Sequence, residues 1–448
     1  MIIEKELTSP IAIADRIDSP WNTFFIWLAG TYNISLFPVI EFILKTYKPD
    51  SAVIIFAVSS LLFFLVGFVG VPGYVIGVPT MSVSARIFHG YMAKAVPLTN
   101  WIALIGWQTI VLVSLVFIFK IILIKLFQVP SNYGLDLSLI IASSATFVVP
   151  LVGHHWLAHV QKVMSFVIVM TSLSIIFMLR HSVSIPNLTM FKINSVYDIM
   201  EGLSLALIAG ALSWSLSASD FSRFTLVGKP RKMFMVVSMG GMIGNGLLLL
   251  SGAILYYGRI LVFTNGGVLY SPLVSSNSSL FLFIFTLLCV SLFATNYVNS
   301  YSSAFNFSIG TGISLTRTSI IIMDSIIVIF FTWVILFHDF FLTAITTFLD
   351  TLGLIVGPWS GVMGTNIIFL LSRNGGFKAD FSLSGAARKL NNWIFVSSLA
   401  ISLLFYQEGD YRGALLRLVH DRDVAPLVGF FISIFIVSVV NCMMTRKT

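Results

Sequence analysis

Charged residues are scarce in this chain of 448 residues, because Asp, Glu, Lys and Arg together make up only 10% of it. An ordinary soluble domain has about 25%. So few charges could not cover the surface of a soluble protein of this length, which excludes a cytosolic enzyme, and the 57% of hydrophobic residues exclude a disordered chain. The alternating pattern of an outer-membrane barrel is missing. We therefore expect an all-α membrane protein with many helical spans.

Cysteine is almost missing as well. The two cysteines, Cys289 and Cys442, cannot form a disulfide framework, and their apolar neighbours indicate small buried side chains. The formal net charge of +8 could suggest nucleic acid in a soluble protein, but here it fits cytoplasmic loops that face anionic lipid. We expect residues 1–21 to be a short polar tail in the cytoplasm, not a cleavable signal peptide.

Long apolar runs are abundant. A membrane-crossing helix needs roughly 20 mostly apolar residues, and we predict twelve, at 22–44, 52–76, 98–119, 137–153, 163–179, 202–219, 234–257, 279–302, 318–337, 341–371, 391–407 and 425–444. Residues 260–316 carry no charge, but they are too long for one helix. Asn265, Gly266 and Pro272 predict a loop in the first part of that stretch.

The distribution of basic residues predicts the orientation. With the N-terminus inside, most of the 26 Lys and Arg residues fall on the inner side, among them Lys5, Lys378, Arg446 and Lys447, as the positive-inside rule requires. Both termini are then cytoplasmic. We expect a multi-pass protein of the cell (cytoplasmic or inner) membrane without a separate soluble domain.

Two spans have polar, glycine-containing centres. Gly30 lies in the middle of the first span with Thr31 and Asn33 beside it, and Gly210 lies in the middle of the sixth span with Trp214 nearby. Transporters often place a binding site where two such helices are interrupted near the middle of the bilayer. The alternative is that these glycines serve close helix packing.

The eighth span carries a polar face. Asn296, Asn299 and Ser303 recur at intervals of three and four residues and share one side of a helix. Amides are costly in hydrocarbon unless they are paired or face a cavity. Hydrogen bonds between helices could explain one or two of them, but a whole polar face indicates the lining of a cavity.

Three segments resemble one known family. They are residues 77–107, with Gly-Val-Pro, Ser-Ala-Arg, Asn and Gly-Trp in order; residues 213–224, with Trp, a run of small polar residues and Asp-Phe-Ser-Arg-Phe; and residues 294–302. In this order they resemble the purine–cytosine permease branch of the nucleobase–cation symporter-1 family, in register over roughly residues 24–370.

The resemblance implies a LeuT-like fold of ten core helices in two inverted repeats plus two peripheral helices. The repeats would be residues 22–180 and 196–372, the peripheral spans 391–444, and the C-terminal tail 445–448. It also implies a secondary transporter that imports a nucleobase or related heterocycle with Na+ or H+, and that is not an enzyme. Its partners would be the heterocycle, the cation and membrane lipid. We expect no cofactor, no nucleic acid and a monomer.

The resemblance assigns candidate site residues. Trp107 and Trp214 would stack on the two faces of a flat ligand, and Asn296 and Asn299 would lie near its edge. Thr31 and Asn33 compete for the polar position in the first span, and two further candidates beside the tryptophans are Gln108 and Ser213. A cation would lie between the first-span break and hydroxyl groups of the eighth span, with Ala29, Tyr32, Ser300, Ser302 and Ser303 as the candidates.

The chemistry of these side chains suits a flat heterocycle without the family. Stacking on an aromatic side chain is worth about 1–3 kcal/mol per base. The amide of Asn or Gln can pair with both donors and acceptors on the rim of the ring. A site that leaves such an amide unpaired for the wrong ligand rejects that ligand strongly.

Five charged residues are candidates for gating or coupling. Glu41 could act as a gate, or its side chain could extend to the interface beside Lys45. Acids inside a membrane are functional candidates by default, although a protonated acid can be purely structural; this applies to Asp324 and Asp350. The other two candidates are Asp220 and Arg223. For Asp220 and Arg223, at the end of the sixth span, we predict a cytoplasmic latch.

Four other classes compete with this interpretation. A membrane enzyme could use His154, His155 and His159, but no carboxylate accompanies them in the sequence, and we expect an interface loop there. An amino-acid or vitamin-precursor permease of the same fold stays open. A major-facilitator protein or a channel fits less well. Among nucleobases, allantoin, hydantoins, hydroxymethylpyrimidine and thiamine, the sequence does not select the substrate.

Overall fold

The computed structural model describes residues 8–181, 183, 193–373 and 381–445. Lys5, Lys378, Arg446 and Lys447, which contribute to the predicted orientation, lie outside the described residues, as do residues 446–448 of the predicted C-terminal tail. The helices are α1 (Pro20–Thr31), α2 (Phe37–Thr46), α3 (Pro49–Leu61), α4 (Phe63–Ile76), α5 (Thr80–Ile87), α6 (Met92–Phe127), α7 (Ser131–Val152), α8 (His154–Leu179), α9 (Val196–Leu207), α10 (Ser213–Ser215), α11 (Ala218–Ser222), α12 (Pro230–Tyr257), α13 (Pro272–Ser276), α14 (Ser278–Thr311), α15 (Arg317–His338), α16 (Phe341–Arg373), α17 (Gly385–Leu403) and α18 (Ala425–Thr445).

Eleven helical segments in the described part of the chain are long and apolar enough to cross a membrane. The predicted span that is not among these eleven, 391–407, corresponds to α17, which begins earlier and ends at Leu403. Arg388, Lys389 and Asn392 near its start lower its mean hydropathy, so α17 is not among the eleven. It packs along α16 and α18.

Several helices extend beyond the predicted spans. The helix predicted at 98–119 is α6, from Met92 to Phe127, and the helix predicted at 279–302 is α14, which continues to Thr311. Polar residues such as Lys94 and Lys125 occupy the added turns of α6. Hydropathy marks the hydrocarbon-crossing part of a helix, whereas its backbone hydrogen bonds continue beyond it.

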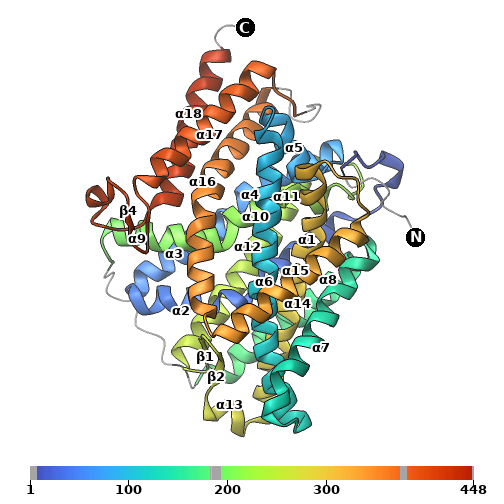
Figure 1. The fold of residues 1–448 in the computed structure, drawn as a ribbon, viewed down its shortest axis with the longest axis vertical. Helices are drawn as coiled ribbons and strands as arrows, with labels where there is room; N and C mark the ends of the chain where they lie inside the picture. Colours follow the sequence, from blue (N-terminus) through green and yellow to red (C-terminus); the bar gives the residue numbers. More distant parts are fainter. Residues whose placement is uncertain (1–7, 182, 184–192, 374–380, 446–448) are drawn as a thin grey trace.

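The loop predicted after residue 260 is a hairpin followed by a short helix. Strands β1 (Leu261–Thr264) and β2 (Gly267–Tyr270) pair antiparallel, and Thr264 lies opposite Gly267. Asn265 and Gly266 form the two-residue turn, for which Asn-Gly is the favoured sequence. In Figure 1 the hairpin and α13 lie at the opposite end of the bundle from α5. A second pair, β3 (Gln407–Glu408) and β4 (Tyr411–Arg412), lies between α17 and α18.

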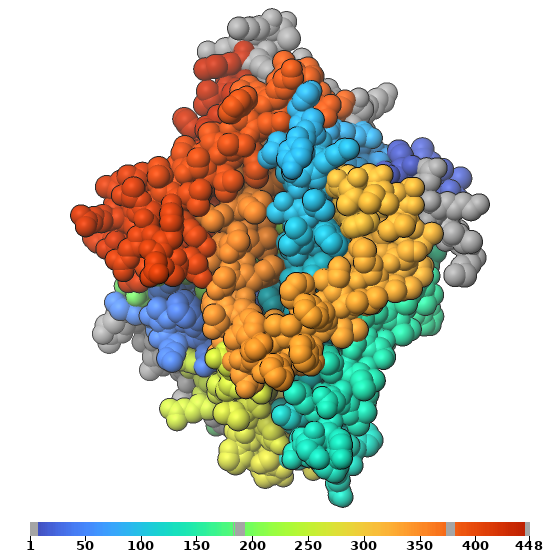
Figure 2. Space-filling model, in the orientation of Figure 1, coloured from blue at the N-terminus to red at the C-terminus, as the bar shows by residue number. Residues whose placement is uncertain are grey.

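Two groups of helices meet in the centre of the molecule. One contains α12 with α1 and α4, which both pack on it, and the other contains α6, α14 and α15. In Figure 1, α6 runs through the middle of the bundle, with α7 and α8 towards one side and α17 and α18 towards the other. On the face that Figure 2 shows, the differently coloured segments lie directly against one another. The candidate site lies where the two groups meet.

Candidate functional site

The first helix break lies between α1 and α2. α1 ends at Thr31, and a 3-10 turn over Ile34–Leu36 leads into α2. Asn33 causes part of this interruption, because its side-chain oxygen accepts hydrogen bonds from the Ser35 backbone N–H at 3.2 Å and from the Ser35 hydroxyl at 2.7 Å. Such local side-chain bonds compete with the helix. Gly30, just before the break, lies against Val298 and Trp214.

The second break lies between α9 and α11. A π-helical segment, Ile208–Leu212, follows α9, and Gly210 within it leaves the helical conformation with φ −116° and ψ −115°. The Ser213 hydroxyl donates to the backbone carbonyl of Ile208 across this segment. The structure therefore contains interruptions at both of the predicted places, and segments of this kind are often found at functional sites.

A small cavity of about 20 Å³ lies beside the two breaks. Five of the predicted substrate residues line it: Trp107, Trp214, Asn33, Asn299 and Ser213. Six further residues complete the lining, namely Asn100, Leu104, Ala209, Leu216, Ser217 and Thr295. Asn100, Leu104 and Thr295 depend on the registers of α6 and α14, which the sequence defined only to within a residue or two. Asn100 precedes Trp107 by seven residues on the same face of α6, and this spacing could have identified it.

The two indole rings are held by neighbouring aromatic rings. Trp107 is 7% exposed and meets Phe348 of α16 edge to face, with 5.2 Å between ring centroids. Trp214 meets Trp27 of α1 in the same manner at 5.7 Å. Edge-to-face packing fixes the orientation of a ring. Both rings line the cavity, as a stacking role requires.

Three other predicted residues lie behind the cavity wall. Thr31 donates to the carbonyls of Trp27 at 2.7 Å and Gly241 at 3.3 Å, so it faces α12. Asn296 donates to the Gln108 backbone carbonyl at 3.4 Å, and the Gln108 side chain donates to its own helix at Leu104. Within the described residues, the amide oxygens of Asn296 and Gln108 have no hydrogen-bond partner.

The predicted cation residues do not converge. Ala29 and Tyr32 are buried at the first break, where the Tyr32 hydroxyl accepts a hydrogen bond from Ser172 of α8 at 3.3 Å. Ser303 donates instead to Asp324 of α15. Ser302 lies near Asp220, and Ser300 is buried with no recorded partner in the described part of the chain.

The central cavity is closed in this structure. A volume of about 20 Å³ holds about one water molecule, so a flat ring can enter only when the surrounding helices move apart. A wider cavity of about 430 Å³ approaches it from the β1–β2 end, and Ile208 on its wall is the chain neighbour of Ala209 in the central cavity. A third cavity of about 380 Å³, between α3 and α12, is almost wholly apolar and has no such link.

The predicted latch residues close the α5 end. Asp220 accepts hydrogen bonds from the backbone N–H of Thr80 at 2.8 Å and from the Thr80 hydroxyl at 2.9 Å. The Arg223 guanidinium is buried between the rings of Phe224 and Phe305, 4.9 Å and 4.6 Å from their centroids. These contacts join α11 to α5 and α14 beneath the central cavity.

The histidine cluster differs from its prediction. His154 and His155 begin helix α8 instead of forming an interface loop, and a carboxylate does accompany them: Asp18 lies 2.5 Å from His154 Nε2 and 3.3 Å from His155 Nδ1. Burial favours a raised pKa for Asp18, but the hydrogen bond from His154 and electrostatic attraction to both histidines lower the pKa overall. No group of three or more His, Cys, Asp or Glu side chains in the described residues could hold a metal ion.

Two of the predicted gating acids line the wide cavity. Glu41 lies on α2 with Lys45, and Asp350 lies on α16, where it shares a hydrogen bond with Glu408. Glu201 and Asp423 lie on the same wall. Asp324 is elsewhere: it is fully buried on α15 between α6 and α14.

Helices interrupted beside a closed central cavity define the class of secondary transporters with a LeuT-like fold. Residues 10–407 match the model of a family described as permeases for cytosine/purines, uracil, thiamine and allantoin. The chain belongs to this family. The members of this family are described as permeases.

Solved structures agree in fold. Mhp1, a nucleobase-cation-symport-1 transporter in a closed conformation with bromovinylhydantoin bound, has 15% sequence identity and a TM-score of 0.69, over 98% of this chain and 95% of that one. Mhp1 in its inward-facing conformation has 14% sequence identity and a TM-score of 0.65, over 98% of this chain and 94% of that one. A manganese transporter of Eremococcus coleocola has 12% sequence identity and a TM-score of 0.56, over 98% of this chain and 99% of that one. No curated protein matches the sequence.

Proposed function

We propose that this protein imports a nucleobase or a related flat heterocycle of the cytosine and purine class by symport with a cation, Na+ or H+. One observation carries the proposal: Trp107, Trp214 and Asn299 come from three separate helices and line one cavity beside two helix breaks. Two ring faces and an amide fit a planar ligand with donors and acceptors on its rim. The protein works as a monomer in the cell membrane, with both termini in the cytoplasm.

Transport proceeds by alternating access. The wide cavity would admit the ligand from outside, and the latch at the α5 end would keep the inside closed until the ligand is bound. We assign α1, α4, α11 and α12 to one moving group and α6, α7, α14 and α15 to the other. Packing inside each group supports this division, because α12 lies on α1 and α4 while α14 and α15 lie on α6 and α7.

Uptake of radiolabelled cytosine, adenine, hypoxanthine and uracil tests the proposal. The host cells should lack their own nucleobase carriers, and each base should be measured with and without Na+ and with a protonophore. Saturable uptake of one base that excess unlabelled base abolishes is the expected result. If none of the four enters above the empty-vector control, although the protein is shown to be in the membrane, the nucleobase class is wrong.

A charged heterocycle is the second candidate. The wide cavity is lined by four acidic side chains, Glu41, Glu201, Asp350 and Asp423, against one basic side chain, Lys45. A negative entrance raises the local concentration of cations. Among the substrates named for the family, thiamine carries a permanent positive charge. Thiamine and its precursors therefore come next in the uptake assay, ahead of amino acids.

A further inference from the structure

The expected Na+ site does not fit the residues that would have to form it. A hard cation takes several oxygen ligands, but α14 presents mainly apolar groups to the break after α1. A Cβ atom at Gly30 would lie 3.2 Å from Val298 Cγ2, and Ala294 is fully buried on the neighbouring turn. The one hydroxyl recorded at this contact, that of Thr295, already donates to the Gly30 carbonyl at 2.9 Å.

The serines that were expected to hold the cation face other helices. Ser303 donates to Asp324 Oδ2 at 2.5 Å, and Ser302 lies near Asp220 of α11. Ser302 and Ser303 of α14 thus lie beside two carboxyl groups and are not directed towards the carbonyls of α1. The candidate sites for the coupling ion are therefore carboxyl oxygens, and a carboxylate oxygen can bind a proton.

Asp324 has unusual surroundings for a charged group. It is fully buried, and its two partners are neutral donors: Ser303, and Trp101 of α6, whose Nε1 donates to Oδ1 at 3.0 Å. The titratable groups on the helices that pack against α15 are elsewhere, and none in the described part of the chain bonds to Asp324. Those with described side chains are Lys94, Lys120 and Lys125 of α6, Tyr133 and Asp136 of α7, Cys289, Tyr297 and Tyr301 of α14, and Asp350 of α16. One further charged residue, Arg373, ends α16.

A lone carboxylate in this position is costly, and a proton removes that cost. An acid inside the membrane without a cationic partner pays a large desolvation energy when charged, and much less when neutral. The Ser303 hydroxyl can serve both forms, because it can donate to a carboxylate or rotate to accept from a protonated acid. Trp101 can only donate. Asp324 can therefore take up and release a proton with one hydroxyl rotation.

Both partners of Asp324 connect it to the substrate cavity. Trp101 directly follows Asn100 on α6, and Ser303 lies one helical turn after Asn299 on α14, and both asparagines line the cavity. A change in the bonding of Asp324 therefore acts on the two helices that would hold the ligand. This gives a physical link between protonation and substrate binding.

We propose that the coupling ion is a proton and that Asp324 carries it. The inference rests on the proposed symport function and specifies its ion. In each cycle Asp324 binds one proton from the outer solution together with the substrate, and releases it to the inner solution. Uptake then rises as the outer pH falls, and it needs no Na+.

Purified protein in liposomes tests this proposal. The probes are radiolabelled cytosine first, then adenine, hypoxanthine and uracil. Uptake is measured in Na+-free buffer with either the outside or the lumen made more alkaline. An entrapped pH-sensitive dye reports the pH of the lumen. When the lumen is more alkaline than the outside, we expect the wild type to accumulate its base in the liposomes. The lumen should become more acidic as the base enters. Asp324→Asn should lose accumulation at least tenfold and the acidification with it, while exchange of labelled for unlabelled base at equal pH stays within about twofold.

A matched variant controls for the substitution itself. Asp339→Asn makes the same chemical change at the other end of α15, where Asp339 adopts a left-handed conformation with φ 50° that Asn tolerates well. It should behave as the wild type. Accumulation driven by a Na+ gradient at constant pH, without lumenal acidification, would overturn proton coupling. Acidification retained by Asp324→Asn would overturn the assignment to Asp324.

A measurement without transport separates this proposal from the substrate proposal. Infrared spectra over a pH series should show the C=O band of a buried protonated carboxyl group in the wild type, and that band should be missing in Asp324→Asn. Loss of the band at the same pH in both proteins would overturn the inference. If none of the four bases is exchanged while the band behaves as expected, the substrate class is wrong and the proton site stands.

Discussion

At the scale of single residues, the site combines two kinds of side chain. Trp107 and Trp214 each meet a neighbouring ring edge to face, whereas Asn299 is buried and its side chain makes no hydrogen bond within the described part of the chain. A buried amide without a partner costs free energy. Under the proposed function, the ligand supplies the missing bonds.

Trp107→Ala and Trp214→Ala should each raise KM for the transported base by about 5- to 150-fold, because each loses about 1–3 kcal/mol of stacking. Trp107→Phe and Trp214→Phe should recover most of the loss. Trp333→Ala is the control, because Trp333 is 50% exposed on α15 and stacks only on Phe337. Concentration-dependent uptake measures the effect. Unchanged KM in both alanine variants would rule out the stacking role.

Asn299→Ala should impair uptake while leaving thermal stability nearly unchanged, because no recorded protein hydrogen bond is lost. Asn306→Ala gives the opposite pattern. Asn306 accepts from Asn100 at 2.8 Å and donates to Ser302 at 2.7 Å, and each bond is worth about 1 kcal/mol. Uptake and thermal unfolding of the two purified variants give the comparison. A large drop in the melting temperature of Asn299→Ala would point to a structural role.

The sequence predicted the kinds of residue at the site better than their exact positions. Both tryptophans, Asn33, Asn299 and Ser213 line the cavity as expected. Asn296 turns towards the backbone of α6, Gln108 bonds to its own helix, and Thr295 lines the cavity on the α14 side. One residue along a helix rotates a side chain by about 100°, so an uncertainty of one residue in register was enough to exchange their roles.

At the scale of elements, the interruptions and the helix ends decide how the bundle can move. Gly244 of α12 shows how closely elements meet: a Cβ there would lie 2.3 Å from the Leu28 carbonyl oxygen of α1. Spans could be read from apolar runs, and breaks from Gly, Asn and Pro within them. The polar start of α17 and the strand pairing of β1 with β2 depend on neighbours that no single run reveals.

Asp423 caps the start of α18, where it accepts from the Gln407 and Ala425 backbone N–H groups at 2.9 Å and 3.0 Å. Burial raises its pKa to about 6, opposed by those two bonds, and nearby Glu201 and Glu408 add to the rise. Because the folded state holds this proton more tightly, its stabilising effect is complete below pH 3.8, the ordinary value, and is lost as the pH rises to about 6.

Asp423→Asn removes this titration and keeps a capping oxygen. Its melting temperature should therefore exceed that of the wild type at pH 7.5 and differ little at pH 4. Thermal unfolding of the detergent-solubilised proteins at both values provides the check. An equal difference at the two pH values would mean that Asp423 does not change its protonation between them.

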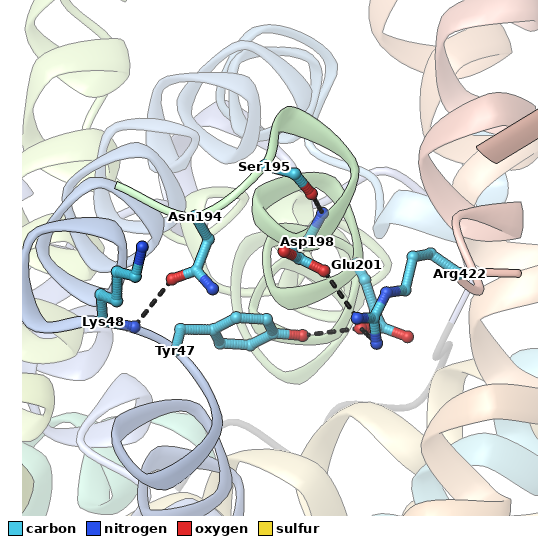
Figure 3. A network of polar contacts seen from close by, with 7 residues as sticks. All are labelled: Tyr47, Lys48, Asn194, Ser195, Asp198, Glu201 and Arg422. Atoms are coloured by element: carbon cyan, nitrogen blue, oxygen red, sulfur yellow. Dashed lines mark hydrogen bonds and ion pairs between the residues drawn. The ribbon is translucent and has the colours of Figure 1, made fainter. Parts of the chain in front are cut away.

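At the scale of the whole molecule, contacts distant in sequence close each end. Asp18 and His154 are 136 residues apart and meet at 2.5 Å, and Arg422 joins Asp198 at 2.8 Å and Glu201 at 3.2 Å. Figure 3 shows the second set: the Tyr47 hydroxyl also donates to Glu201, and Asn194 meets Lys48. Side chains so far apart give no signal in a single sequence.

Arg422→Ala should free α9 from the loop before α18. We expect faster opening of the wide cavity and a moderately higher rate of base exchange, with about 1 kcal/mol or less of lost stability, because Arg422 is partly exposed. Arg412→Ala, on the exposed strand β4, is the matched control. Exchange rates in liposomes measure the effect. An exchange rate equal to that of the control would mean that the clamp does not restrain α9.

The contact of Arg422 with α9 also bears on which part of the chain can work alone. α9 leads into the second helix break, yet its N-terminal half is tied to the loop between α17 and α18. α18 adds to this, since Pro426 lies against Gly353 and Gly357 of α16. The last two helices therefore restrain α9, the helix that leads into the proposed transport site. A ten-helix version of this protein would keep the pocket and lose its restraint.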